Sequence, residues 1–256
     1  MIKNMYLKVK DKKIFYDIIE SGKSQALVFI HGSGGSSYTW KNQLNLAIDY
    51  DLIALDLPSH DKSDTFSDLS LNLYVDVVHQ LIKSLNYENV ILCGHSLGGA
   101  IVQQYYFTYP KEVSGLILFN TGARLRVAPF FLNSIKNNYQ KFLDSLPADA
   151  FYRATPEETI KLYIQETSKI SADVTYKDFK ICDGFDVLNK LSTIEVPCLI
   201  IVGKQDQLTP VKYSEFFRNK IKNSELHIID KAGHMVMLEK PNDVNQAIEN
   251  FIYNHF

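Results

Sequence analysis

The sequence predicts an α/β protein whose central sheet is mostly parallel and is flanked by helices. Short apolar runs recur along the chain and are mostly apolar on both faces, as strands buried between helices must be. Segments with helical spacing separate several of these runs. Residues 123–190 break this alternation, because they contain no clear strand and carry apolar and aromatic residues at helical intervals. These three observations favour a parallel α/β sheet with one helical insertion.

The strand signals begin with an N-terminal hairpin. Residues 6–19 carry two short β-like runs that are separated by the polar residues 11–13. Six further apolar runs follow, and several of them end at glycine or proline: residues 26–32, 51–58, 89–96, 114–122, 196–203 and 225–230. We expect these runs to form the body of the sheet.

The helical signals lie between these runs. Tyr74, Val77, Val78, Leu81, Ile82 and Leu85 follow the spacing of one helix face, and Ser70 is placed to cap that helix. Residues 97–109 form the next predicted helix, which Pro110 ends. Two more are expected over 210–220 and 241–253. Within the helical insertion, Pro147 and Pro156 are expected to interrupt the helices.

Composition excludes several classes of function. The chain has 256 residues, a net charge of -2 and no basic stripe, which disfavours nucleic acid and anionic membranes as partners. It has no apolar run near the roughly 20 residues that span a bilayer, and no signal-peptide pattern. Three distant cysteines predict neither a disulfide framework nor a zinc site. We therefore expect a cytoplasmic protein without a metal; oligomeric state is not predicted.

Ser96 lies between a predicted strand and a predicted helix, in the pattern Gly94-x-Ser96-x-Gly98. A serine hydroxyl is a poor nucleophile at neutral pH and must be presented to the substrate beside a base. In this pattern a sharp, strained turn lifts the hydroxyl out at the carboxyl edge of the sheet, and glycines two residues away leave room for it. Ser96 is therefore the candidate nucleophile.

An acid and a histidine should follow the serine in that order. Asp206 comes directly after the run 196–203, and His234 comes after the last run and a short loop. The acid would accept the Nδ1 proton of the histidine and stabilise the imidazolium. The other six histidines lie in settings where a structural or surface role is expected: His31, His60, His79, His95, His227 and His255.

Backbone N–H groups near the nucleophile would hold the negative charge that develops on a substrate oxygen. The N–H of Leu97 is one candidate, because it begins the helix after Ser96. The glycine-rich stretch 31–37 provides a second, from Ser33 or alternatively Gly34. A phosphate-binding loop is disfavoured here, because the Lys-Ser/Thr ending of that motif is absent.

Taken together, these motifs resemble the α/β-hydrolase superfamily, in its esterase-like branch with a helical cap. The resemblance spans nearly the whole chain and is carried by His31-Gly32, Asp56-Leu57-Pro58, Gly94-His95-Ser96-Leu97-Gly98-Gly99, Gly203 with Asp206 and Pro210, and Gly233-His234. It implies an eight-stranded sheet, a core of residues 1–122 and 191–256, a cap of residues 123–190, and a Ser96–His234–Asp206 triad. The chain departs from its relatives at Ser59 and Asp61, which stand where glycine is common.

The expected reaction is hydrolysis of a carboxylic ester, or a related acyl bond, through an acyl-enzyme on Ser96. No metal or organic cofactor is needed. The aromatic residues of the cap suggest a small, largely apolar substrate. Candidate substrate contacts are Gly34, Arg124, Phe130 and Phe131. Arg124 or Arg126 would hold a substrate carboxylate, although a salt bridge between cap and core is the simpler role for Arg124.

Three alternatives remain at this point. A carbon–carbon bond hydrolase or lyase uses the same triad, but Ala100 stands where one cyclohexadiene-forming branch carries arginine. A small-molecule receptor with slow turnover shares the fold. A purely structural role would not require a nucleophile, acid and histidine in order. Cleavage of carbon–halogen bonds or epoxides is disfavoured, because those relatives use aspartate at the nucleophile position.

Overall fold

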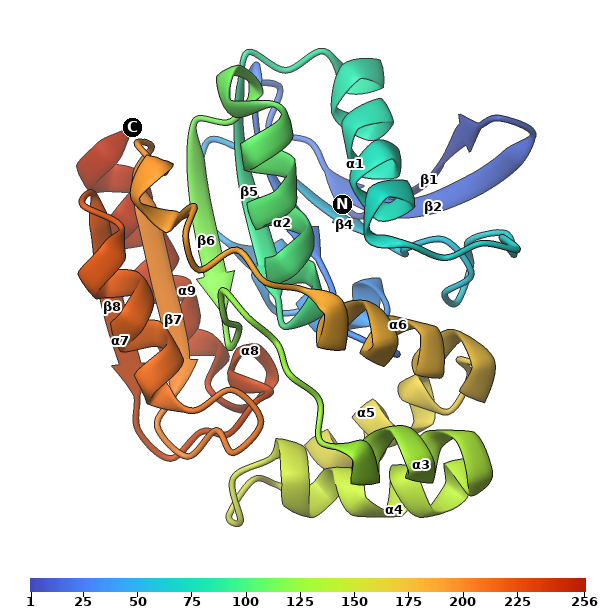
Figure 1. The fold of residues 1–256 in the computed structure, drawn as a ribbon. Coiled ribbons are helices and arrows are strands. Elements are labelled where there is room, and N and C mark those ends of the chain that lie inside the picture. Colours follow the sequence, from blue (N-terminus) through green and yellow to red (C-terminus); the bar gives the residue numbers. More distant parts are fainter.

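The computed structural model describes residues 1–256 and contains one eight-stranded sheet (Figure 1). Its strands are β1 (Lys3–Val9), β2 (Lys12–Ile19), β3 (Gln25–Ile30), β4 (Asp51–Leu55), β5 (Asn89–His95), β6 (Gly115–Phe119), β7 (Cys198–Gly203) and β8 (Ser224–Ile229). Their order across the sheet is β1-β2-β4-β3-β5-β6-β7-β8. Only the β1–β2 and β2–β4 pairs are antiparallel. The predicted α/β-hydrolase fold with a mostly parallel sheet is confirmed.

Both faces of the sheet are covered, which explains why the strand sequences are apolar throughout. Side chains alternate along β3, so that Val28 and Ile30 enter one apolar core while Leu27 and Phe29 enter the other. The first core is covered by α1 (Leu71–Leu85), α2 (Leu97–Thr108) and α7 (Val211–Lys220). The second is covered by α8 (Val236–Glu239) and α9 (Pro241–His255). Short 3₁₀ helices at Ser37–Trp40, Gln43–Asn45, Pro110–Glu112 and Leu191–Thr193 lie in the connections.

Helix α1 forms where its spacing predicted. Tyr74, Val77, Val78 and Leu81 are fully buried on one face of this helix. The hydroxyl of Ser70 accepts a hydrogen bond from the N–H of Leu73 at 3.2 Å and caps the first turn. The burial of this stripe therefore fixes α1 against the sheet, and its cap satisfies one of the free N–H groups at the helix start.

Between β6 and β7 the chain forms four helices, which lie beyond the carboxyl edge of the sheet (Figure 1). They are α3 (Pro129–Asn137), α4 (Tyr139–Ala150), α5 (Glu157–Thr167) and α6 (Ala172–Gly184). We call residues 123–190 the cap. The two ends of the cap meet, because the N–H of Val187 donates to the carbonyl of Ala123 at 2.7 Å.

The prediction that Pro147 interrupts the cap helices is wrong. Helix α4 continues through Pro147. The helix is held by an apolar face on both sides of the proline, where Phe142, Leu143, Leu146 and Ala150 are buried. Pro156 lies at a helix boundary as expected, at the N-cap of α5. No helix in the structure is both long enough and apolar enough to cross a membrane.

Candidate active site

The turn between β5 and α2 places Ser96 at the carboxyl edge of the sheet. Ser96 has φ 52° and ψ -113°, in the region of positive φ where side chains are rarely tolerated. The backbone is also crowded here. A Cβ on Gly94 would lie 2.3 Å from the carbonyl oxygen of Gly98, and a Cβ on Gly98 would lie 2.1 Å from that of Ile30. Both glycines are therefore required by close approach of the backbone, as the motif predicts.

Asp206 and His234 come together at the same edge, from the loops after β7 and β8. The His234 Nδ1 donates to Asp206 Oδ2 at 2.9 Å, and both residues are buried. The same Oδ2 accepts from the Thr209 hydroxyl at 2.6 Å and from the Asn120 amide at 2.7 Å. Oδ1 accepts the N–H groups of Leu208 and Thr209 at 2.8 and 3.0 Å. Five donors thus surround one carboxylate.

This arrangement keeps Asp206 ionised. Burial alone would raise the pKa of its carboxyl, but the His234 ring and the Thr209 donors outweigh burial and hold that pKa below its usual range. An ionised Asp206 fixes the proton of His234 on Nδ1 and leaves Nε2 free to accept one. The supporting residues Asn120 and Thr209 were not predicted. Asn120 directly follows β6, at the same edge of the sheet as Ser96. A polar residue directly after a predicted strand was the sequence signal that could have identified it.

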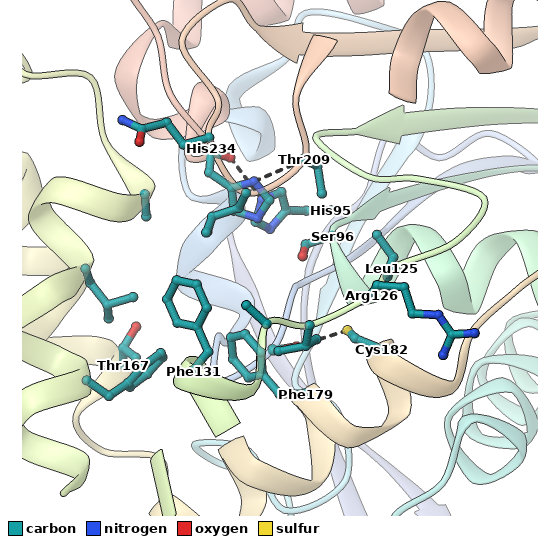
Figure 2. Close-up of a pocket in the computed structure, with 18 of the residues that line it drawn as sticks. His95, Ser96, Leu125, Arg126, Phe131, Thr167, Phe179, Cys182, Thr209 and His234 are labelled. Atoms are coloured by element: carbon teal, nitrogen blue, oxygen red, sulfur yellow. Dashed lines mark hydrogen bonds between the residues drawn. The ribbon is translucent and has the colours of Figure 1, made fainter. Parts of the chain in front are cut away.

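Ser96 and His234 line one cavity, and Figure 2 shows the Ser96 hydroxyl on the same side of the cavity as the His95 and His234 rings. The His234 ring bonds to Asp206 and Thr209, and no hydrogen bond joins it to Ser96 in this structure. Such contacts are often long before substrate binds. His95 supports the histidine loop, because its Nε2 donates to the His234 carbonyl at 3.0 Å. Burial lowers the pKa of His95, so this ring is neutral.

The candidate oxyanion donors differ in whether their N–H groups already donate a hydrogen bond within the protein. The N–H groups of Ser33 and Leu97 donate to no acceptor in the protein. The N–H of Gly34 instead donates to Asp178 Oδ2 at 3.0 Å. The alternative that Gly34 supplies the second donor is therefore wrong, because a buried carboxylate already occupies that N–H. Ser33 lines the cavity together with Ser96.

The cavity beside Ser96 lies between the sheet edge and the cap, with a volume of about 220 Å³. Of its 20 lining residues, 12 are hydrophobic, which makes it suited to an apolar group. Its cap wall includes Phe142, Leu146 and Tyr163. Phe131 and Phe179 complete this wall (Figure 2). Phe131, one of the predicted substrate contacts, thus lies in the cavity wall.

Three other predicted substrate contacts lie outside the cavity wall: Gly34, Arg124 and Phe130. Gly34 is bonded to Asp178, as described above. Phe130 faces solvent and is 55% exposed, because α3 turns the neighbouring Phe131 inward. Arg124 pairs with Asp186 at 3.7 Å near the junction of cap and core.

Arg126 does line the cavity, but not as a carboxylate clamp. Figure 2 shows its guanidinium pointing away from Ser96. That group donates to the carbonyl of Asp183 at 2.7 Å. No group of three or more His, Cys, Asp or Glu side chains is placed to hold a metal ion.

Comparison with known proteins gives one consistent family. Residues 27–247 match the sequence model of the Alpha/beta hydrolase family. The chain is 27% identical to a pimeloyl-[acyl-carrier protein] methyl ester esterase of Wigglesworthia glossinidia brevipalpis, over 94% of this chain and 98% of that one. It is 26% identical to an (E)-2-((N-methylformamido)methylene)succinate hydrolase of Acinetobacter baylyi, over 91% and 92% of the two chains.

Comparison with solved structures also identifies an esterase. A thermophilic esterase is 37% identical and superimposes with a TM-score of 0.89, covering 99% of this chain and 98% of its own.

Proposed function

Because the chain belongs to the alpha/beta hydrolase family, we propose that it is a carboxylesterase that cleaves small, largely apolar esters through an acyl-enzyme on Ser96. The observation that carries this proposal is the Asp206–His234 pair. Its carboxylate is bound by five donors, and its imidazole opens into the same cavity as Ser96. A structural ion pair has no need of a serine held at positive φ beside it.

The geometry supports acyl transfer in two steps. In the first, the Ser96 Oγ attacks the ester carbonyl while His234 Nε2 accepts the hydroxyl proton. The N–H groups of Ser33 and Leu97 bind the oxyanion that forms. The carbon–oxygen bond of the ester then breaks, and His234 returns the proton to the leaving alcohol. In the second step water attacks the acyl-enzyme, with His234 again taking and returning a proton, which releases the acid and free Ser96.

The size and lining of the cavity set the proposed substrate class. Drug-sized ligand sites usually have volumes of about 300–1,000 Å³. A cavity of about 220 Å³ with mostly apolar walls fits a short aliphatic or an aromatic acyl group. The methyl ester and esterase relatives described above support ester cleavage. We include in the proposal that substrates are small molecules and that the enzyme acts in the cytoplasm without a cofactor.

The test combines a probe with a substrate panel. A fluorophosphonate should label Ser96 in the wild type and leave Ser96→Ala unlabelled. Hydrolysis of p-nitrophenyl esters should be fastest for short chains, and Ser96→Ala should abolish it. Phe179→Ala removes a large side chain from the cavity wall and so enlarges the cavity. It should shift the substrate preference toward esters with longer acyl chains. Full ester hydrolysis by Ser96→Ala would refute the proposal, and labelling without turnover on any ester would favour the receptor alternative.

A further inference from the structure

A fully buried carboxylate on the cap is bonded to three separate segments of the core. Asp178 lies on α6, and its side chain has no exposed surface. Its Oδ2 accepts from the N–H of Gly34 at 3.0 Å and from His60 Nε2 at 2.9 Å. Its Oδ1 accepts from the Tyr74 hydroxyl at 2.6 Å. The core partners come from the loop after β3, the loop after β4 and helix α1.

The partners of His60 indicate that this is an ion pair. Its Nδ1 faces the Pro58 carbonyl at 3.0 Å and its Nε2 faces Asp178. Since a carbonyl and a carboxylate both accept, the ring satisfies both when each nitrogen carries a proton. Burial disfavours the charged ring, but Asp178 outweighs burial and raises the pKa of His60. The neighbouring ring of His31 is neutral, because burial lowers its pKa to about 3.

The loop that carries His60 has a strained backbone on both sides of the histidine. Ser59 has φ 70° and Asp61 has φ 37°, so non-glycine residues on both sides of His60 adopt positive φ. Ser59 and Asp61 are also the two positions at which many α/β-hydrolase relatives have glycine. The ion pair with Asp178 helps to hold this costly loop in one conformation.

Asp178 also fixes the loop that carries the proposed oxyanion donor. The N–H of Ser33 belongs to the same planar peptide unit as the Gly32 carbonyl, which accepts from His31 Nδ1 at 2.8 Å and from the N–H of Gly35 at 3.1 Å. The next peptide unit carries the N–H of Gly34, which Asp178 holds. Both peptide units that flank Ser33 are therefore anchored, and the anchor of the second one comes from the cap.

The face of α6 that meets this loop is continuous over two turns. Thr175, Asp178 and Cys182 lie three and four residues apart, on one face of the helix. A Cβ on Gly34 would lie 3.2 Å from Thr175 Oγ1, so the helix lies close to this loop. One turn further on, Cys182 Sγ lies 3.5 Å from Ser33 Oγ.

We propose that Asp178 is a positioning residue for ester hydrolysis: from the cap, it holds the 33–34 backbone so that the Ser33 N–H faces the developing oxyanion. The inference rests on the proposed function. Asparagine removes the charge that keeps His60 protonated, and a neutral His60 keeps its Nδ1 proton on the Pro58 carbonyl, so its Nε2 becomes an acceptor. The asparagine then turns its NH₂ to His60 Nε2 and its oxygen to the Tyr74 hydroxyl. A donor thereby faces the N–H of Gly34, and the Ser33 peptide loses its anchor on that side. Displacing one oxyanion donor should affect the transition state more than the bound ester.

The main test is Asp178→Asn with short p-nitrophenyl esters. We expect kcat to fall by about 10- to 100-fold while KM changes by less than about threefold. The affinity for a trifluoromethyl ketone, which forms a tetrahedral adduct with its oxygen at the donor site, should fall in parallel with kcat. Asp173→Asn is the matched control, because it makes the same change on the exposed side of α6 and should leave kcat unchanged.

Tyr74→Phe separates positioning from stability. It removes the donor to Oδ1 but leaves the bonds of Gly34 and His60 to Oδ2. This variant should unfold at a lower temperature than the wild type, while its kcat falls by less than about threefold. Equal losses of kcat in Tyr74→Phe and Asp178→Asn would show that the network acts only through stability, and would overturn the proposal.

A second pair of variants avoids removing a buried charge, in case Asp178→Asn does not fold. Gly34→Ala adds a Cβ close to Thr175 Oγ1 at a residue with φ 63°, and should displace the loop from α6, lowering kcat by about tenfold or more. Thr175→Ala removes the two nearest atoms that the new Cβ would meet, so adding it to Gly34→Ala should restore the part of the loss that this contact causes and leave the part that the backbone strain causes. Wild-type kcat in Gly34→Ala contradicts the proposal.

These outcomes are distinguishable from failure of the proposed function. If fluorophosphonate labels Ser96 and Ser96→Ala is inactive, the esterase proposal stands whatever the Asp178 variants do. If Asp178→Asn then retains wild-type kcat and inhibitor affinity, only the positioning role is refuted.

Discussion

Asp206→Asn tests the proposed triad with little change in shape. Asp206 Oδ1 accepts two loop N–H groups, and the asparagine oxygen can keep both. The new amide NH₂ then stands where Oδ2 accepted from Asn120, the Thr209 hydroxyl and His234. A donor now faces His234 Nδ1. The imidazole proton is therefore expected to move to Nε2, the nitrogen that must accept the Ser96 proton.

The expected loss of rate follows from this change of tautomer. We expect kcat for a short p-nitrophenyl ester to fall on the order of 10³- to 10⁴-fold, by analogy with the same substitution in other triads. At about 1.4 kcal/mol for each factor of ten, this is about 4–5.5 kcal/mol of transition-state stabilisation. KM should change little, because Asp206 does not line the cavity.

Stability gives an independent readout of the same substitution. The pKa of Asp206 is lower in the folded protein than its unfolded value of about 3.9. Its ionised form therefore stabilises the fold above about pH 4, and this contribution is lost as the pH falls through the folded pKa. The difference in unfolding free energy between wild type and Asp206→Asn should shrink in acid. Asp11→Asn, in the turn between β1 and β2 with its side chain fully exposed, is the control and should behave like the wild type. Retention of more than a tenth of wild-type kcat by Asp206→Asn would refute the assigned role of the aspartate.

Three further predictions concern the fold and the rejected substrate contact. Gly98→Ala should fail to give a stable protein, because its Cβ would lie 2.1 Å from the Ile30 carbonyl oxygen, and soluble yield with circular dichroism measures this. Burial raises the pKa of Asp56 to about 6, so its ionisation should cost the fold about 3 kcal/mol at pH 7. Urea unfolding should therefore show wild-type stability falling, relative to Asp56→Asn, as the pH rises from about 4 to 6; no pH dependence in that difference contradicts it. Arg124→Ala should leave the ratio of kcat/KM for acidic and neutral esters unchanged and cost at most about 1 kcal/mol of stability, since the half-exposed pair with Asp186 is solvent-screened.

The sheet was predictable because burial on two faces leaves a simple signal. Runs of apolar residues between helical segments specify a parallel sheet, and the carboxyl ends of its strands share one edge. Asp206 and His234 each follow such a strand, so their approach could be predicted without knowing any side-chain packing. Ser96 was identified because Gly94 and Gly98 mark a turn that side chains cannot occupy.

The cavity-lining residues of the cap could not be predicted from the sequence. They depend on how the cap helices pack against the core, and helical periodicity alone does not determine this packing. Phe130 and Phe131 are adjacent and equally apolar, and only the orientation of α3 decides that Phe131 enters the cavity. Asp178 looks like an ordinary helical aspartate in the sequence. Its partners at positions 34, 60 and 74 lie over 100 residues away, and no local pattern joins them.

The cap is also fastened to the histidine loop. The N–H groups of His234 and Met235 both donate to the carbonyl of Ala150, at 2.8 and 3.2 Å. Glu239 accepts from the N–H groups of Gly233 and Tyr152, each at 2.8 Å. The cap is therefore hydrogen-bonded to the core at two places. One is the loop that carries His234, and the other is the loop that carries Ser33, which Asp178 holds. New substrate preferences are thus most safely engineered at Phe131 of α3, which lines the cavity and takes part in neither set of hydrogen bonds.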